Sequence, residues 1–182
     1  AVLLCCSWTN AQAPTAAPPV AAPGSNSEDL AALKRSAESG DAAAQVRLGR
    51  AYELGHGVRQ DDAQAVAWYR KAADQGNAEA QNTLGIMYST GRGVERDKKE
   101  AVQWYHKAAR LGLSQAMFNL GTAYYNGEGT EVDDAAAYAW FTLGSLAGSA
   151  AAVDAVHRME AELKPWQRGQ AMMDLGEIFE AG

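Results

Sequence analysis

Apolar residues recur through the middle of the chain at helical spacing. A first set lies four residues apart: Ala44, Leu48 and Tyr52. A second set follows at intervals of three and four: Ala65, Trp68, Tyr69 and Ala72. Residues at these intervals share one face of an α-helix. The pattern therefore predicts two amphipathic helices joined by a polar loop.

The same pattern recurs at a spacing of 36 residues, in units that begin at Gly40, Gly76 and Gly112, and a degraded unit begins at Gly148. Ten positions are identical in the first three units; in the first they are Gly40, Ala44, Leu48, Gly49, Tyr52, Gly55, Gly57, Asp61, Ala65 and Trp68. A period of this length is typical of stacked repeats. The sequence thus predicts an all-α fold, an α-solenoid of antiparallel helix pairs.

Glycine and aspartate mark the ends of the predicted helices. Gly55 stands where the first helix has to stop, because glycine adopts a left-handed backbone at little steric cost, and Gly57 lets the loop turn back. Asp61 precedes the second helix, where its carboxylate can accept hydrogen bonds from the first turn. Gln64 and its equivalent Glu100 stand at the spacing of a capping box, which the third unit lacks.

Each predicted first helix contains an internal glycine: Gly49, Gly85 or Gly121. Such a glycine costs about 1 kcal/mol relative to alanine, so it needs a reason. We expect the partner helix to approach too closely for a Cβ, with Ala44 and Ala65 narrowing the same contact. The space between units is expected to be filled by the repeated tryptophans Trp68, Trp104 and Trp140.

The aligned positions form a consensus. The pattern A-x-x-x-L-G-x-x-Y-x-x-G-x-G-V-x-x-D-x-x-x-A-x-x-W-Y-x-K-A-A-x-x-G is present at residues 44–76 and 80–112. It resembles the Sel1-like repeat family, relatives of the tetratricopeptide repeats. The resemblance implies a right-handed superhelix of antiparallel helix pairs that binds other proteins.

This resemblance covers residues 28–182 and divides them into units. Residues 28–39 look like the second helix of a missing unit, a capping helix over the first pair. Three repeats follow at 40–75, 76–111 and 112–147, and residues 148–182 look like a C-terminal capping pair. The third unit departs from the pattern, since YAWFTLGSLAG replaces its W-Y-x-K-A-A-x-x-G end.

The first 27 residues carry no charge and hold four of the five prolines. Residues 1–13 are interpreted as the remnant of a signal peptide, with cleavage after Ala11 or Ala13; Pro14 disfavours the second. Residues 14–27 then form a Pro/Ala-rich tether. The interpretation places the chain in the bacterial periplasm or outside the cell. A lipid anchor on Cys5 or Cys6 is the weaker alternative, because neither cysteine follows a small residue.

Charge and motifs narrow the function. The formal net charge of -6 argues against nucleic acid or an anionic membrane surface as partner, and no apolar run is long enough for a transmembrane segment. The spacings typical of nucleophilic catalysis, metal ligation and phosphate binding are absent. His157 and Glu160 lie three apart but lack a third ligand. We therefore expect no enzyme activity, no cofactor and no metal.

In tetratricopeptide arrays the first helices line a concave wall, so the resemblance implies partner-binding positions. These are Val46, Arg50, Glu53, Asn82, Ile86, Ser89, Phe118, Thr122, Tyr125, Asp154 and Arg158. The favoured function is a scaffold or adaptor of the cell envelope that binds a peptide or protein there. Two alternatives stay open: an envelope enzyme acting on peptidoglycan or a β-lactam, and a permanent structural subunit of an envelope complex. The oligomeric state is left open.

Overall fold

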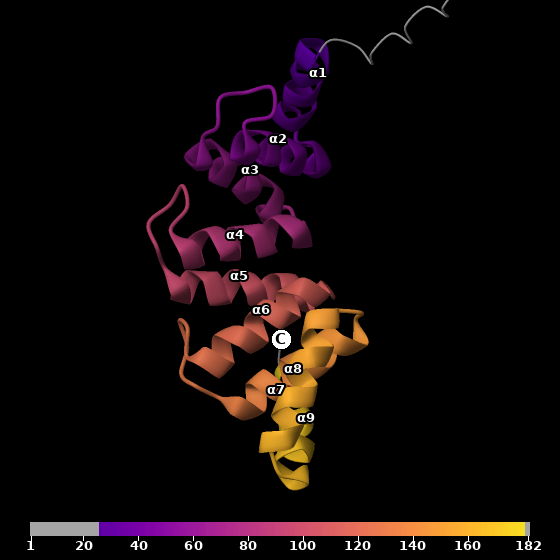
Figure 1. The fold of residues 1–182 in the computed structure, drawn as a ribbon. Helices are drawn as coiled ribbons and strands as arrows, with labels where there is room; N and C mark the ends of the chain where they lie inside the picture. The colour runs from indigo at the N-terminus through magenta and orange to yellow at the C-terminus, as the bar shows by residue number, and fades with distance from the viewer. Residues whose placement is uncertain (1–25, 181–182) are drawn as a thin grey trace, which may run out of the picture.

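The computed structural model describes residues 26–180. Every regular element in this range is an α-helix: α1 (Asn26–Glu38), α2 (Ala42–Leu54), α3 (Asp62–Asp74), α4 (Ala78–Thr90), α5 (Lys98–Arg110), α6 (Ser114–Asn126), α7 (Asp134–Leu146), α8 (Ala150–Glu162) and α9 (Pro165–Glu180). The helices stack in chain order into an elongated solenoid (Figure 1), which confirms the expected fold. The expected signal segment and the tether as far as residue 25 lie outside the described residues.

Neighbouring helices form the expected pairs. α2 packs with α3, α4 with α5 and α6 with α7, and each pair packs on the next through α3 with α4 and α5 with α6. α1 covers the first pair, while α8 and α9 both pack on α7. The repeated leucines at the centres of the pairs are fully buried: Leu48, Leu84 and Leu120. Of helices α1 to α9, none combines the length and apolar character needed to cross a bilayer.

The helix boundaries follow from the predicted glycine and aspartate signals. Gly55 ends α2 with a φ of 72°, a left-handed conformation that favours glycine. Asp61 begins α3 by accepting a hydrogen bond from the backbone N–H of Gln64 at 3.0 Å. Asp97 and Asp133 cap α5 and α7 in the same way. The loops between paired helices are therefore fixed at both ends.

The capping-box part of this prediction was wrong. A capping box would direct the side chain of the third helical residue back to the N–H of the capping residue. Instead, the N–H of Asp61 donates to the carbonyl oxygen of Tyr52 at 3.0 Å, which closes the loop onto the end of α2. In the second pair, Glu100 accepts the indole N–H of Trp104 at 3.0 Å.

The internal glycines lie against an aromatic ring of the partner helix. A Cβ built on Gly49 would stand 3.0 Å from the ring of Tyr69, so the expectation of a close approach is confirmed. The three nearest atoms belong to that ring, whereas Ala44 and Ala65 were expected to narrow the same contact. The other two pairs repeat the arrangement: Gly85 with Tyr105, and Gly121 with Phe141.

The repeated tryptophans join each helix pair to the element before it. Trp104 packs in one apolar cluster with residues of the first pair, and Trp140 in another with residues of the second. Trp68 lies against residues of α1 and α2. Trp104 and Trp140 are 4% and 1% exposed, whereas Trp68 is only half-buried. Within residues 26–180 only α1 precedes the first pair, so Trp68 is less well covered.

Candidate partner-binding face

A cavity of about 470 Å³ opens between α6, α7 and α8. Four of the expected partner-binding residues line it: Phe118, Thr122, Tyr125 and Arg158. Phe141 and Met159 form its apolar floor, and Asn126 and Glu162 add polar groups. A volume of a few hundred Å³ with apolar walls and a few polar groups is typical of a binding site.

The cavity arises where the third unit departs from the repeat. In the first pair, the hydroxyl of Tyr69 donates to Oε2 of Glu53 at 2.7 Å. In the second, the hydroxyl of Tyr105 reaches Oγ of Ser89 at 3.4 Å. The same two positions in the third pair hold Phe141 and Tyr125, so no equivalent hydrogen bond can form there. The wall thus changes from polar to aromatic at the third unit.

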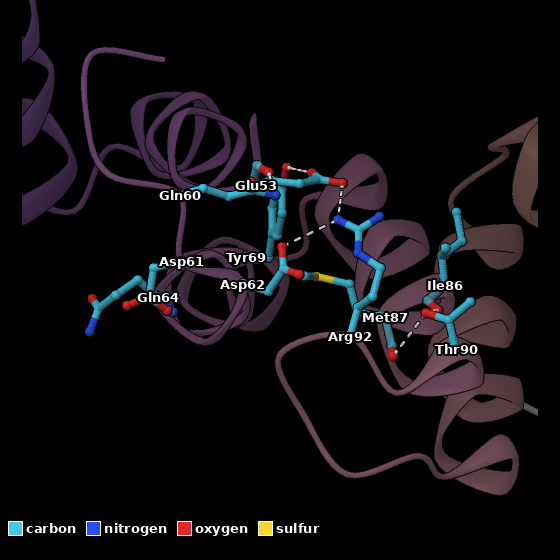
Figure 2. Close-up of polar contacts among 10 residues, drawn as sticks. All are labelled: Glu53, Gln60, Asp61, Asp62, Gln64, Tyr69, Ile86, Met87, Thr90 and Arg92. Carbon is cyan, nitrogen blue, oxygen red and sulfur yellow. Dashed lines mark hydrogen bonds and ion pairs between the residues drawn. The ribbon is translucent and has the colours of Figure 1, made fainter. Parts of the chain in front are cut away.

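Glu53 is held inside a network between the first two pairs (Figure 2). Its Oε1 accepts from the guanidinium of Arg92 at 2.7 Å, and the same nitrogen lies 3.5 Å from Asp62. Burial opposes ionisation of Glu53, but the hydrogen bonds from Tyr69 and Arg92 outweigh it and lower the pKa of the carboxyl. Burial, and then the hydrogen bond to Glu53, raise the pKa of Tyr69.

Loop glycines bring Arg92 to this position. A Cβ on Gly93 would collide with the backbone carbonyl of Asp62, so the loop after α4 lies directly on the first turn of α3. Gly129 stands in the same relation to Lys98 one unit later. There Nζ of Lys98 pairs with Oε1 of Glu128 at 3.2 Å. These ions occupy the repeat positions of Asp62 and Arg92 with their charges exchanged.

The other expected residues are not gathered at the cavity. Val46 and Asn82 are only 8% and 7% exposed, and Oδ1 of Asn82 accepts from the side-chain amide of Asn119 at 2.8 Å. The carbonyl oxygen of Ser89 accepts from Nε of Arg96 at 3.0 Å. Ile86 and Asp154 are exposed on α4 and α8. The structure therefore divides the predicted wall into interior, network and open positions.

Arg50 lies in a second depression, at the N-terminal end of the solenoid. This groove, of about 590 Å³, is lined from α1 by Asp29, Leu30 and Leu33 and from α2 by Arg47 and Arg50. His56 and the neighbouring glycines of the loop complete it. Its floor is partly aliphatic and its rim mostly cationic. Sequence reasoning named Arg50 but missed Arg47, one helical turn away on the same face.

His106 has a packing role that the sequence did not reveal. Its Nε2 lies 3.1 Å from the hydroxyl of Tyr124, and its ring meets that of Trp140 edge to face with centroids 5.5 Å apart. Burial lowers the pKa of His106, so the imidazole is neutral at pH 7. Across residues 26–180, no three His, Cys, Asp or Glu side chains are grouped so that they could hold a metal ion.

Sequence reasoning missed several residues that line the cavity, among them the two apolar floor residues Phe141 and Met159. Phe141 stands at the position where the first two units have tyrosine, and this difference was the available signal. Met159 lies on α8, one helical position beyond Arg158, and only the packing of α8 on α7 brings it to α6. The spacing of residues within one helix does not predict a contact among three helices.

Comparisons with known proteins agree with the repeat. A family model described as Sel1 repeat matches residues 42–77, 78–113 and 114–149. Each matched unit starts at a first helix, two residues after the glycine that opens the unit in the sequence pattern. A comparison with curated proteins finds no match.

Several solved structures are similar. A protective antigen of uropathogenic Escherichia coli strains, displaying an SLR fold, is 36% identical with a TM-score of 0.74 over 76% of this chain, which spans 30% of its length. A Sel1 repeat protein from Oxalobacter formigenes is 38% identical with a TM-score of 0.67, over 72% of this chain and 98% of that one. Helicobacter pylori cysteine rich protein B is 21% identical with a TM-score of 0.56, over 70% and 92%, and shares the fold.

Proposed function

Since the chain belongs to the Sel1 repeat family, whose members are typically scaffolds for protein interaction, we propose that it is a non-catalytic adaptor of the bacterial cell envelope. It binds a peptide or protein segment on the wall formed by its first helices. The uncharged, proline-rich N-terminal segment supports a periplasmic or secreted location. The similarity to a protective antigen of Escherichia coli is consistent with such a location.

The observation that carries the proposal is the cavity between α6, α7 and α8. Tyr125 is 44% exposed at its edge, while the ring of Phe141 is buried beneath it. An exposed aromatic beside a buried apolar floor, with a guanidinium from Arg158 nearby, is the composition of an interaction hot spot. A site for one or two apolar side chains of a polypeptide follows from this lining.

Unbiased peptide selection tests the proposal. A random library of peptides long enough to cross the wall, about 12 residues or more, is selected on the purified chain. Enriched peptides are expected to lose at least about tenfold in affinity for Tyr125→Ala, because truncating a hot-spot aromatic costs more than 1 kcal/mol. Leu146→Ala is the matched control, since Leu146 is 78% exposed and lies outside the cavity lining.

The same samples address the alternatives. Turnover of a β-lactam or of peptidoglycan by the wild-type chain at an enzyme-like rate would replace the adaptor proposal with the enzyme. Failure to enrich any peptide that distinguishes Tyr125→Ala from Leu146→Ala would remove the cavity as a binding site. A partner that copurifies in fixed stoichiometry and resists high salt would instead favour a permanent structural subunit.

A further inference from the structure

The groove between α1 and α2 carries two exposed arginines, Arg47 and Arg50. Among the described residues neither lies within salt-bridge distance of a carboxylate, although Arg47 attracts Asp41 and Arg50 attracts Glu53 electrostatically. Arg92, by contrast, is paired with Glu53 and Asp62. Asp29 is the acidic member of the lining. Two exposed guanidinium groups one helical turn apart offer local positive charge on a chain whose net charge is -6.

The groove and the cavity lie on the same wall. Arg50, Thr122 and Arg158 occupy one repeat position, 72 and then 36 residues apart, and Thr122 and Arg158 line the cavity. Arg47 likewise shares its position with Ala155, another lining residue. Equivalent positions of a solenoid face the same side, so a single extended chain can contact both depressions.

The second unit carries no charge at the two equivalent positions. In the second unit, the positions of Arg47 and Arg50 hold Thr83 and Ile86. Thr83 donates to the carbonyl oxygen of Glu79 at 2.9 Å within its own helix. At the far end, Arg158 shares the rim of the cavity with Glu162, so positive charge is not in excess there. The excess is confined to the N-terminal groove.

From this arrangement we propose that the ligand is bipartite: an acidic peptide segment binds at Arg47 and Arg50, and a bulky apolar residue of the same peptide fills the cavity at Tyr125 and Phe141. The proposal rests on the proposed function and names the chemistry of its ligand. Carboxylates match a guanidinium in charge and geometry. An aromatic or large aliphatic side chain matches the apolar lining of the cavity.

The two subsites require a spacer in the ligand. Helices α3, α4 and α5 pack in series between α2 and α6, so the peptide has to cross the second unit to reach the cavity. An extended chain rises only about 3.3 Å per residue, so the acidic cluster and the anchor cannot be neighbours in the peptide. Uncharged residues are expected in this spacer, because the net negative charge of the protein would repel carboxylates that lie outside the groove. The ligand is thus an acidic cluster and an aromatic anchor separated by a neutral stretch.

Charge exchange tests the acidic subsite. Peptides enriched on the wild-type chain are synthesised with their Asp and Glu replaced by Asn and Gln, or by Lys. Neutralisation is expected to weaken binding at least tenfold in fluorescence anisotropy, and the double variant Arg47→Glu, Arg50→Glu to weaken the acidic peptide similarly. The Lys peptide is expected to bind this double variant better than it binds the wild type.

A charge-matched control separates local pairing from general repulsion. Lys99→Glu with Lys164→Glu makes the same change of net charge at exposed residues outside both depressions, and is expected to leave binding within about twofold. Enriched peptides that depend on Tyr125 but contain no acidic cluster, or that ignore the charge exchange, would refute the bipartite ligand and leave the adaptor standing. If peptide binding also does not depend on Tyr125, both the bipartite ligand and the proposed adaptor function are refuted.

Discussion

The side-chain amide of Gln75 donates a hydrogen bond to Oε1 of Gln45 over 2.7 Å and so ties the end of α3 to the interior face of α2. Nε2 of Gln45 in turn donates to the carbonyl oxygen of Ala37 at 3.0 Å. One unit later, Nε2 of Gln81 makes the equivalent bond to Ala73 at 3.0 Å. The repeat position of Gln75 there holds Leu111, and Oε1 of Gln81 is buried without a hydrogen-bond partner among the described residues.

Leu111→Gln is therefore expected to stabilise the protein. The new amide can donate to the orphan Oε1 of Gln81, and a hydrogen bond that satisfies a buried acceptor contributes about 0.5–1.5 kcal/mol. Little apolar burial is lost, because Leu111 is 56% exposed. Urea denaturation measures the change. Leu146→Gln, at an even more exposed leucine, is the control and should stay within about 0.5 kcal/mol of wild type. Equal stability of the two variants would contradict the argument.

The local features of the fold could be predicted from the sequence because each is determined within one unit. Gly55 and Asp61 act on the backbone next to them, so their identity alone marks a helix end. The packing of Gly49 was predicted in kind but not in partner. The ring of Tyr69 comes from the other helix, and which side chain meets the glycine depends on the crossing of the two.

The candidate site could be predicted only in part, because contacts between units decide it. Glu53 was assigned to the wall by its repeat position, but its carboxylate is bound by Arg92, whose loop folds back from the next unit. Val46 was also assigned to the wall and is buried in the cluster that holds Trp104. Tyr125 remains open because the third unit has no polar partner for it at Phe141.

Gly85→Ala is expected to destabilise the protein, against the usual sign. Alanine in place of an exposed helical glycine stabilises by about 1 kcal/mol. At Gly85 the added methyl would collide with the ring of Tyr105, and overpacking of a filled interior costs roughly 1–3 kcal/mol. Gly169→Ala in α9 is the matched control, because a Cβ there meets nothing within 4 Å. The midpoint temperature of thermal unfolding should therefore fall for Gly85→Ala and rise for Gly169→Ala.

The Glu53 network predicts a loss of stability in acid. The pKa of Glu53 is lowered in the folded chain, so its contribution is complete above the unfolded value of about 4.5 and disappears as the pH falls through the folded value. Glu53→Gln should remove this part of the pH dependence. Unfolding free energies of wild type and variant are expected to differ above pH 5 and to converge as the pH falls through the lowered pKa of folded Glu53. Glu95→Gln, the same substitution at an exposed side chain, is the matched control.

Truncation of the tryptophans should cost different amounts, although they occupy one repeat position. Trp140 is 1% exposed within the cluster that joins the second and third pairs, so Trp140→Ala leaves a cavity and is expected to cost about 3–5 kcal/mol. Trp68 is half-buried, and Nζ of Lys71 lies 3.8 Å from its ring centroid at the surface. Trp68→Ala should therefore cost clearly less, since part of its ring is already in contact with water. Equal losses of unfolding free energy in urea denaturation would contradict this prediction. They would mean that α1 covers the first pair as tightly as the second pair covers the third.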